Sequence, residues 1–448
     1  MPRLIPHVIP HVIPHDTPHV IPHIRPALRL ASLGACASLL LACAHSSPSQ
    51  PSDGPDADLL GRAAGYPVAP NPTRIATPAF LVGSWSALDK VPGIRSNWVA
   101  RPTQAQPLPR ASAPPPIRYR IDGFQLTLED YLQRQRVTGL LVLKNGEIVA
   151  EHYRYDRNDS HRFRSASMAK SVTSLLIGVA QAKGQIASLD DPADRYVRDL
   201  AGSPYGATSI RHLLRMSSGL TFTERYDGKD DVARLGQAGI TGKPTVPEVL
   251  RGITQRHSPA GEKFVYASAE TEVLGRVLTA ATGRSMADLT REWLWEPLGA
   301  EQDAFWCTDP AGQEGAYHCF NAVLRDWGRL GLLMAQDGKV GDRQLVPRDY
   351  VLDATDPARQ PPALRPLRAT PYFGYGYQFW LMPLKERTFA MQGVYGQAVY
   401  VQPSSGIVMV QTAVWPAASG QQDPRPGIER NAMWLGGLES LGGSTARR

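Results

Sequence analysis

The sequence predicts an α/β domain of the α+β type over residues 118–440, in which an antiparallel sheet is flanked by helices. Two hairpin patterns predict the sheet, one near the start of this region at residues 139–153 and one near its end at residues 397–412. Between about 186 and 330, the apolar residues are mostly spaced as in helices. We therefore expect both ends of the region to complete one sheet, with a helical subdomain inserted between them.

The first hairpin joins two apolar runs, Gly139–Leu143 and Ile148–Tyr153, through a short polar turn. Asn145 and Gly146 lie at the centre of that turn, and this pair supplies the two residues of positive φ that a type I′ turn needs. The second hairpin follows the same plan, with its strands and its turn at residues 397–402, 407–412 and 403–406.

A helix is predicted directly after Ser167. Its apolar residues have the i, i+3, i+4, i+7, i+8 spacing of a core-facing helix, at positions 172, 175, 176, 179 and 180. Gly184 is a natural stop for this helix. Further helical patterns follow at residues 210–216, 246–254, 269–282, 286–295 and 322–335.

Residues 1–43 are expected to form a leader and a signal peptide rather than part of the fold. Residues 5–24 repeat Ile-Pro-His-Val with small variations, and proline at that density prevents both helix and sheet. A histidine-rich metal tract is one interpretation of this repeat. A dispensable leader, or an upstream repeat translated from a misassigned start, is the other, and the composition favours it.

The end of this segment is typical of an export signal. Two arginines precede an apolar run over residues 30–42, which is too short to span a bilayer as a mature helix. The run ends in Leu40-Leu-Ala-Cys43, which resembles the lipobox of bacterial lipoproteins, and Ala44 in place of Asp implies sorting to the outer membrane. We expect a cell-envelope or periplasmic protein that is lipidated at Cys43 and anchored in the outer membrane. The alternative is plain secretion.

Residues 44–117 are expected to form a tether and an N-terminal extension. Residues 44–58 are rich in Ser, Pro and Asp, as in flexible tethers. Residues 60–116 contain apolar patches such as Ala79–Val82 and end in a proline-rich stretch. We expect this extension to pack on the main domain.

The most informative motif is Ser167-Met-Ala-Lys170 at the start of the predicted helix. At a helix N-terminus, Ser167 lies at the positive end of the helix dipole, beside free backbone N–H groups. Lys170 lies three residues further on the same helix face, within reach of the serine Oγ. A desolvated lysine can lose its proton and act as a base, so the pair has the components of an activated nucleophile.

Two further elements follow this motif in order along the chain. Tyr266-Ala-Ser268 comes first, and Gln392 and Gly393 lie on a strand near the C-terminus. Taken singly, Lys170 is better explained as a solvated helix residue than as a catalytic one. In the same way, Tyr266 alone is better explained as a half-buried core aromatic. Taken together and in this order, they predict a serine acyl-transfer enzyme.

The ordered motifs resemble the serine β-lactamase and penicillin-binding-protein superfamily. Within it, they resemble the branch of class C enzymes, family VIII-type esterases and 6-aminohexanoate-dimer hydrolases, and look closest to the last of these. The resemblance covers roughly residues 120–435, and its matching segments are 163–173, 210–220, 261–268, 320–326 and 392–397.

This resemblance implies a β-lactamase-like fold and an acyl-enzyme on Ser167. Lys170 and Tyr266 would carry protons, and either of them could be the general base. The backbone N–H groups of Ser167 and Val394 would form the oxyanion hole, and Gly393 would let the last strand approach the substrate.

Two positions depart from the pattern of the superfamily. Ser268 stands where most relatives have Asn, and would support Lys170 by a hydrogen bond. Met391-Gln392-Gly393 stands where relatives carry Lys-Thr-Gly or His-Thr-Gly, whose cation helps to hold a substrate carboxylate. Its loss favours small linear amides or carboxylic esters as substrates, with Gln392 beside them. A β-lactamase or DD-peptidase is the first alternative, and a non-catalytic envelope binding protein is the second.

Two cysteines of the main domain have alternative interpretations. Cys307 and Cys319 would form a disulfide in an exported chain or stay as two buried thiols, and no second Cys/His pair suggests a metal site.

The net charge of +7 is scattered without a basic run, so we expect no nucleic-acid partner. We expect no metal or organic cofactor, and membrane association only through the lipid anchor. Polar loop residues Glu224 and Tyr226 would contact either substrate or solvent.

Overall fold

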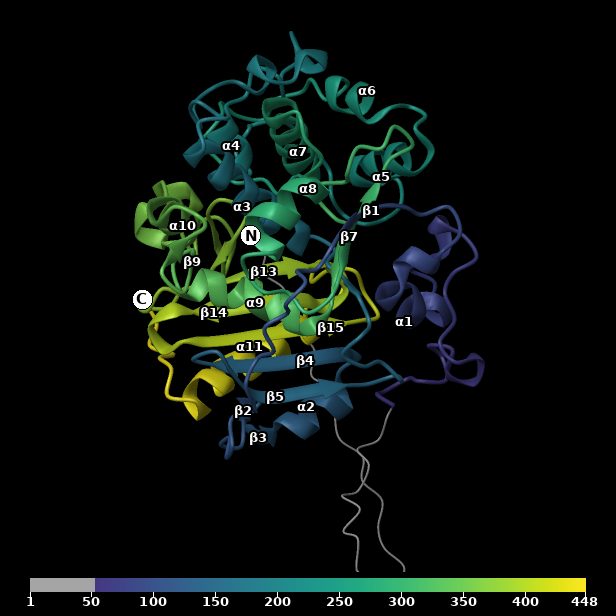
Figure 1. Cartoon of the computed structure of the whole chain (residues 1–448), viewed down its shortest axis with the longest axis vertical. Helices are drawn as coiled ribbons and strands as arrows, with labels where there is room; N and C mark the ends of the chain where they lie inside the picture. Colours follow the sequence, from purple (N-terminus) through teal and green to yellow (C-terminus); the bar gives the residue numbers. More distant parts are fainter. Residues whose placement is uncertain (1–52) are drawn as a thin grey trace, which may run out of the picture. The chain divides into compact units, whose positions relative to one another are not determined.

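A computed structural model describes residues 53–448, so the leader, the signal peptide and Cys43 lie outside the described residues. Its main sheet is antiparallel and seven-stranded, in the order β11-β12-β13-β14-β15-β4-β5 (Figure 1). The strands are β4 (Val137–Lys144), β5 (Glu147–Tyr153), β11 (Gly374–Tyr375), β12 (Trp380–Leu381), β13 (Phe389–Gly393), β14 (Gln397–Gln402) and β15 (Ile407–Ala413). The expected sheet, completed by both ends of the region, is confirmed.

The two predicted hairpins pair with each other at the centre of this sheet. Strand β15 of the second hairpin is hydrogen-bonded to β4 of the first, with Val410 opposite Leu141. Asn145 and Gly146 both have positive φ, 51° and 86°, as the Asn-Gly turn requires. The Asn-Gly turn therefore joins β4 to β5, and this pair shifts register between Val142 and Leu143.

The sheet is buried on both faces, because β4 is apolar at every position from Leu140 to Leu143. Leu141 and Leu143 face a core that includes α3 (Met168–Ala182) and α9 (Leu324–Ala335). Leu140 and Val142 face a second core that includes α2 (Leu128–Arg134) and α11 (Arg425–Ser440). The short hairpin of β2 (Arg118–Ile121) and β3 (Phe124–Thr127) packs beside α11.

The inserted helical region ends earlier in the chain than the sequence predicts. Its helices are α4 (Ile210–Leu214), α5 (Asp231–Thr241), α6 (Val246–Arg251), α7 (Ser268–Thr282) and α8 (Met286–Thr290). Helix α9, whose start the sequence places inside the insertion, packs instead on strands β4, β14 and β15. Helix α5 is not predicted from the sequence, because Gly236 and Gly239 weaken its helical pattern. After helix α9 the chain also forms β9 (Lys339–Val340), β10 (Arg343–Gln344) and α10 (Arg348–Thr355).

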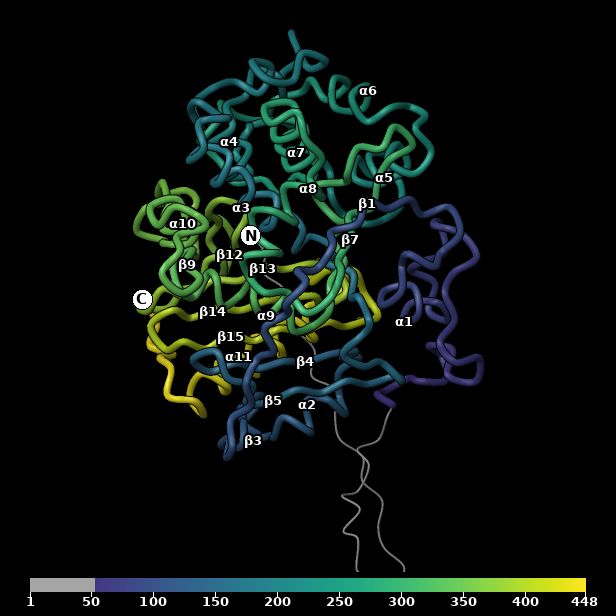
Figure 2. The backbone as a smooth tube through the Cα atoms, in the orientation of Figure 1, coloured from purple at the N-terminus to yellow at the C-terminus, as the bar shows by residue number. Residues whose placement is uncertain are grey.

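The N-terminal extension is built into a second sheet of order β1-β7-β8-β6. Its strands are β1 (Arg95–Val99), β6 (Phe163–Arg164), β7 (Ala304–Thr308) and β8 (Phe320–Ala322). Strand β1 pairs antiparallel with β7, with Arg95 opposite Thr308. Figure 2 shows the extension passing from α1 (Pro78–Ser86) to β1 and then along β7 towards β3. The extension is thus more than a segment packed on the surface.

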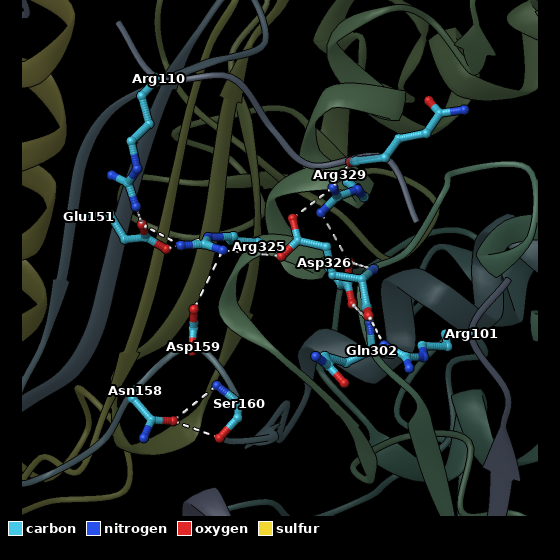
Figure 3. A network of polar contacts seen from close by, with 12 residues as sticks. Arg101, Arg110, Glu151, Asn158, Asp159, Ser160, Gln302, Arg325, Asp326 and Arg329 are labelled. Carbon is cyan, nitrogen blue, oxygen red and sulfur yellow. Dashed lines mark hydrogen bonds and ion pairs between the residues drawn. The ribbon is translucent and has the colours of Figure 1, made fainter. Parts of the chain in front are cut away.

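A network of buried ion pairs fixes α9 to its surroundings (Figure 3). The Arg325 guanidinium donates two hydrogen bonds to Glu151 of β5, at 2.7 and 3.0 Å. Asp326 accepts backbone N–H groups of Glu301 and Gln302 at 2.8 and 3.1 Å. Arg325 and Asp326 belong to one of the segments that carry the superfamily resemblance, and their contacts are structural.

Across residues 53–448, none of the helices combines the length and the apolar character that crossing a membrane would require.

Candidate active site

Ser167 is presented at a sharp turn between strand β6 and helix α3. Ala166, directly before it, has a φ of 43°, which lies in the left-handed region that L-residues rarely adopt. Ser165 holds this turn, because its backbone N–H donates to the Phe320 carbonyl at 2.9 Å and its Oγ accepts the Phe320 N–H at 3.0 Å. The strained backbone is therefore tied to strand β8, and Ser167 remains partly exposed.

Lys170 lies one helical turn after Ser167, and its side chain is buried (1% exposed). Its Nζ donates to Ser167 Oγ at 2.9 Å, to Ser268 Oγ at 3.0 Å and to the Tyr317 carbonyl at 3.0 Å. Burial lowers the Lys170 pKa to about 8, and the Glu224 carboxylate opposes that change. A substantial fraction of Lys170 is consequently neutral near physiological pH.

Tyr266 lies beside Lys170. Its ring centroid is 5.0 Å from Lys170 Nζ, and the Ser167 side chain acts to lower the pKa of its hydroxyl. The ring stacks on Trp380 with centroids 5.4 Å apart. Burial raises the pKa of the Tyr266 phenol, and the Glu224 carboxylate raises it further, so the group is a neutral hydroxyl at pH 7. The structure thus brings all three predicted side chains together.

Glu224 is a member of this cluster that the motifs did not reveal. Its carboxylate accepts the Ser268 backbone N–H at 2.8 Å and the Ser268 hydroxyl at 2.9 Å. The Tyr226 hydroxyl donates to the same carboxylate at 2.5 Å. The Ser268 hydroxyl therefore accepts a hydrogen bond from Lys170 and donates one to Glu224, as a hydroxyl can. Only the position of Glu224 in a loop after Gly219-Leu220 marked it in the sequence.

The end of strand β13 lies against the nucleophile. A Cβ on Gly393 would lie 3.0 Å from the Ser167 backbone nitrogen and 2.5 Å from the Ser165 carbonyl oxygen. Val394, the next residue, lines the same cavity as Ser167. Tyr395 after it has a φ of 59°, so the backbone turns sharply here. The two residues expected to donate to an oxyanion therefore share one wall of the cavity.

The cavity beside Ser167 has a volume of about 280 Å³. Its lining includes polar groups of the cluster, among them Ser268 and Glu224. The N-terminal extension and helix α5 also line it, and their apolar lining residues include Ile75, Trp85, Leu88, Ile94, Val232 and Leu235. The substrate space is therefore mostly apolar and is partly closed by residues that precede the main domain.

Cys307 and Cys319 also lie at this cavity. The structure joins them in a disulfide between strand β7 and the loop that leads into β8. That loop carries Tyr317, whose carbonyl accepts a hydrogen bond from Lys170. Residues 53–448 contain no group of His, Cys, Asp and Glu side chains that could hold a metal ion.

The family profile described as Beta-lactamase matches residues 124–423 of the chain. The chain belongs to the beta-lactamase family. It is a serine hydrolase of this superfamily, in agreement with the resemblance of its motifs.

Relatives of this beta-lactamase-family protein include amidases and esterases. It is 26% identical over 320 residues to a 6-aminohexanoate-dimer hydrolase of Paenarthrobacter ureafaciens, covering 69% of this chain and 80% of that protein. It is 27% identical over 228 residues to Esterase EstB of Burkholderia gladioli, covering 45% of this chain and 57% of that protein. A solved structure of a candidate 6-aminohexanoate-dimer hydrolase from Bacillus anthracis has the same fold, with a TM-score of 0.72, 23% identity and coverage of 82% of this chain and 95% of that one.

Gln392 occupies a different environment from the one the sequence suggested. Its side-chain carbonyl accepts a hydrogen bond from Arg430 of helix α11, and it does not line the cavity beside Ser167. Met391 is buried in the core on the opposite side of the strand. In this beta-lactamase-family protein, strand β13 therefore contributes backbone groups to the active site. Neither Met391 nor Gln392 provides a cation there.

Proposed function

We propose that this serine hydrolase cleaves linear amides or carboxylic esters through an acyl-enzyme on Ser167. One observation carries the proposal: the Ser167 Oγ lies 2.9 Å from the Nζ of a buried lysine. Burial lowers the Lys170 pKa to about 8, whereas it raises the pKa of Tyr266. Lys170 is therefore the better base of the two at neutral pH, and Tyr266 the better proton donor.

In the first step, neutral Lys170 accepts the Ser167 proton as Oγ forms a bond to the substrate carbonyl carbon. The carbonyl electron pair moves to oxygen, and the resulting oxyanion is stabilised by the backbone N–H groups of Ser167 and Val394. The strained turn at Ala166 and the close approach of Gly393 to the Ser167 nitrogen support this assignment.

In the second step, the bond to the leaving group breaks and the acyl group stays on Ser167. The Tyr266 hydroxyl gives its proton to the leaving nitrogen or oxygen, and Lys170 restores the tyrosine proton. Water then attacks the acyl carbon while the same groups take up its proton, and Ser167 is released with a carboxylic acid product.

The substrate class rests on the departure at strand β13 and on the relatives. Met391 and Gln392 supply no cation there, which disfavours a β-lactam or a peptidoglycan stem peptide. The relatives include a protein named as a 6-aminohexanoate-dimer hydrolase and one named as an esterase. Turnover of a chromogenic cephalosporin at a rate comparable to that of simple esters would reverse this assignment.

We also propose that the protein is exported and lipidated at Cys43. The proposal rests on the Leu40-Leu-Ala-Cys43 sequence after a short apolar run. Metabolic labelling with a palmitate analogue tests it: label is expected on the wild-type protein in the outer-membrane fraction and none on Cys43→Ser. Equal label on the variant would show that Cys43 is not the acceptor.

The activity is tested by exposing the purified protein to a fluorophosphonate and measuring its intact mass. We expect one adduct on the wild type, none on Ser167→Ala, and one on Ser160→Ala, which removes an exposed serine elsewhere. No adduct on a wild-type protein shown to be folded by circular dichroism would overturn the proposed nucleophile. Hydrolysis of esters and linear amides is then compared between the wild type and Ser167→Ala.

A further inference from the structure

Arg164 is a cation in the wall of the catalytic cavity. It lies on strand β6, three residues before Ser167, and lines the same cavity. The only hydrogen bond to its guanidinium among residues 53–448 is a 3.4 Å contact between Nη2 and the His318 ring. Its buried Nε has no hydrogen-bond partner in that part of the chain.

Among residues 53–448, three of the four buried arginines have carboxylate partners, and the fourth, Arg430, donates to the neutral side chain of Gln392. Arg154 pairs with Glu129 at 2.6 Å, and Arg329 pairs with Asp326 at 3.1 Å. No such ion pair involves Arg164 within the described residues 53–448. Arg164 is partly exposed at the cavity and has one long hydrogen bond, so its guanidinium is available to a negative group that enters the cavity.

The groups around Arg164 do not supply that negative charge. Burial, Arg164 and Lys170 together lower the His318 pKa to about 3, so His318 is a neutral partner at pH 7. Tyr317 and Tyr395, the two other titratable groups near it, have raised pKa values through burial and are neutral as well. Burial lowers the pKa of Arg164 itself to about 10, which still leaves it charged at pH 7.

The extension holds the guanidinium in place. The Arg164 guanidinium lies over the Trp85 ring, 4.9 Å from its centroid. Trp85 is itself fixed, because its indole N–H donates to the Ile75 carbonyl at 3.2 Å and its ring meets Tyr395 edge-on at 4.9 Å. A guanidinium stacked on an aromatic ring keeps its edge N–H groups free for a planar acceptor.

We propose that Arg164 binds a carboxylate group of the substrate. The inference rests on the proposed function and narrows it to linear amides or esters that carry a carboxylate away from the bond to be cleaved. The carboxylate meets the edge of the Arg164 guanidinium, and the apolar part of the substrate lies against the walls that Ile75, Leu88 and Leu235 contribute. Arg164 thereby offers a cation from strand β6, which belongs to a different sheet from the Met391 and Gln392 positions on strand β13.

A matched pair of esters tests the inference. One is the 4-nitrophenyl ester of hexanoic acid, and the other is the mono-4-nitrophenyl ester of hexanedioic acid, which ends in a carboxylate. We expect the wild type to prefer the carboxylate ester in kcat/KM by about tenfold, in line with a charge-assisted bidentate contact. Arg164→Met should abolish that preference, so that the ratio of the kcat/KM values for the two esters falls to about one.

Control variants separate the charge from the fold. Arg162→Met removes a neighbouring arginine that stacks on Trp98, outside the cavity lining, and should leave the preference unchanged. Arg164→Lys keeps the charge and should retain part of the preference. If Arg164→Met does not fold, the preference of the wild type and of Arg164→Lys decides the matter. Equal kcat/KM for the two esters in the wild type would overturn the inference.

A binding experiment distinguishes failure of this inference from failure of the proposed function. Titration calorimetry of hexanedioate is carried out on Ser167→Ala and on the Ser167→Ala/Arg164→Met double variant. Binding to the first and at least about tenfold weaker binding to the second is expected, even if no ester is hydrolysed. Hydrolysis of both esters at equal rates, with no binding of hexanedioate, would leave the proposed function standing and remove the role of Arg164.

Discussion

Gly393 and Ser167 pack so closely that no side chain fits between their backbones. A Cβ at position 393 would lie 3.0 Å from the Ser167 nitrogen, a distance that real Cβ atoms rarely show. The Ser167 N–H is one of the two proposed oxyanion donors, and the other follows Gly393 directly in the chain. The absence of a side chain at position 393 thus sets how near the two donors are to each other.

Gly393→Ala is expected to reduce kcat/KM about 100-fold, because the added methyl group displaces a donor from the position of the oxyanion. The effect should fall on kcat, since the oxyanion exists only in the transition state. Steady-state kinetics with an ester substrate measures it. Gly427→Ala is the matched control, because a Cβ there meets no atom within 4 Å and the helix tolerates it. Equal activity of the two variants would contradict the proposed oxyanion hole.

The pH dependence should report the state of Lys170. Because Lys170 must be neutral to accept the Ser167 proton and burial lowers its pKa to about 8, kcat/KM for a neutral ester should rise with pH and level off above about 8. Below that inflection it should fall about tenfold for each pH unit. A profile that is flat from pH 6 to pH 9 would exclude Lys170 as the base.

Glu224→Gln should move that profile to lower pH. The Glu224 carboxylate raises the Lys170 pKa against the effect of burial, and the amide removes the charge while it keeps the shape. A pH–rate series on both proteins measures the shift. A purely structural role for Glu224 would lower kcat at every pH and leave the inflection where it was.

Reduction of the Cys307–Cys319 disulfide should destabilise the protein. The bridge closes a loop of 12 residues, and loops of about 15 residues contribute about 3 kcal/mol in the chain-entropy account. The melting temperature should therefore fall when a phosphine reductant is added, as measured by calorimetry. A Cys307→Ser/Cys319→Ser double variant, already lower in melting temperature, should not respond to the reductant.

Glu151→Gln should weaken the fold and spare the chemistry. The Glu151 side chain is 3% exposed and receives two hydrogen bonds from Arg325, which also pairs with Glu301, so the change weakens a partly buried ion-pair network. Loss of about 2 kcal/mol in the free energy of unfolding is expected at pH 7, measured by urea denaturation. The Arg325 and Arg110 guanidiniums lower the Glu151 pKa, so the difference between the two proteins should shrink as the pH falls through that pKa. Fluorophosphonate labelling of the folded variant should match the wild type.

Local spacing explains what the sequence predicted well. Lys170 lies beside Ser167 because residues three apart share a helix face, and the Asn145-Gly146 pair fixes its hairpin through backbone sterics. Both relations are contained within a few consecutive residues. The order of the motifs along the chain then indicated the family, and the fold of that family includes the antiparallel sheet.

Contacts between distant segments explain what the sequence did not predict. Glu224 reaches Lys170 only through Ser268, 44 residues further along the chain. The alternation of strand β13 turns Met391 and Gln392 to opposite faces, and which face meets the cavity depends on how the strand pairs. Strand β1 has no apolar periodicity of its own and is defined by its pairing with β7.

The wall formed by Trp85 and Ile75 has a consequence for how this chain diverges. The family profile begins at residue 124, whereas this wall lies before it. Part of the substrate cavity is therefore encoded upstream of the stretch that carries the catalytic residues. Substitutions in the upstream stretch can change which molecules fit the cavity without changing a residue that transfers a proton or carries the acyl group. Close homologues can therefore share one reaction and accept different substrates.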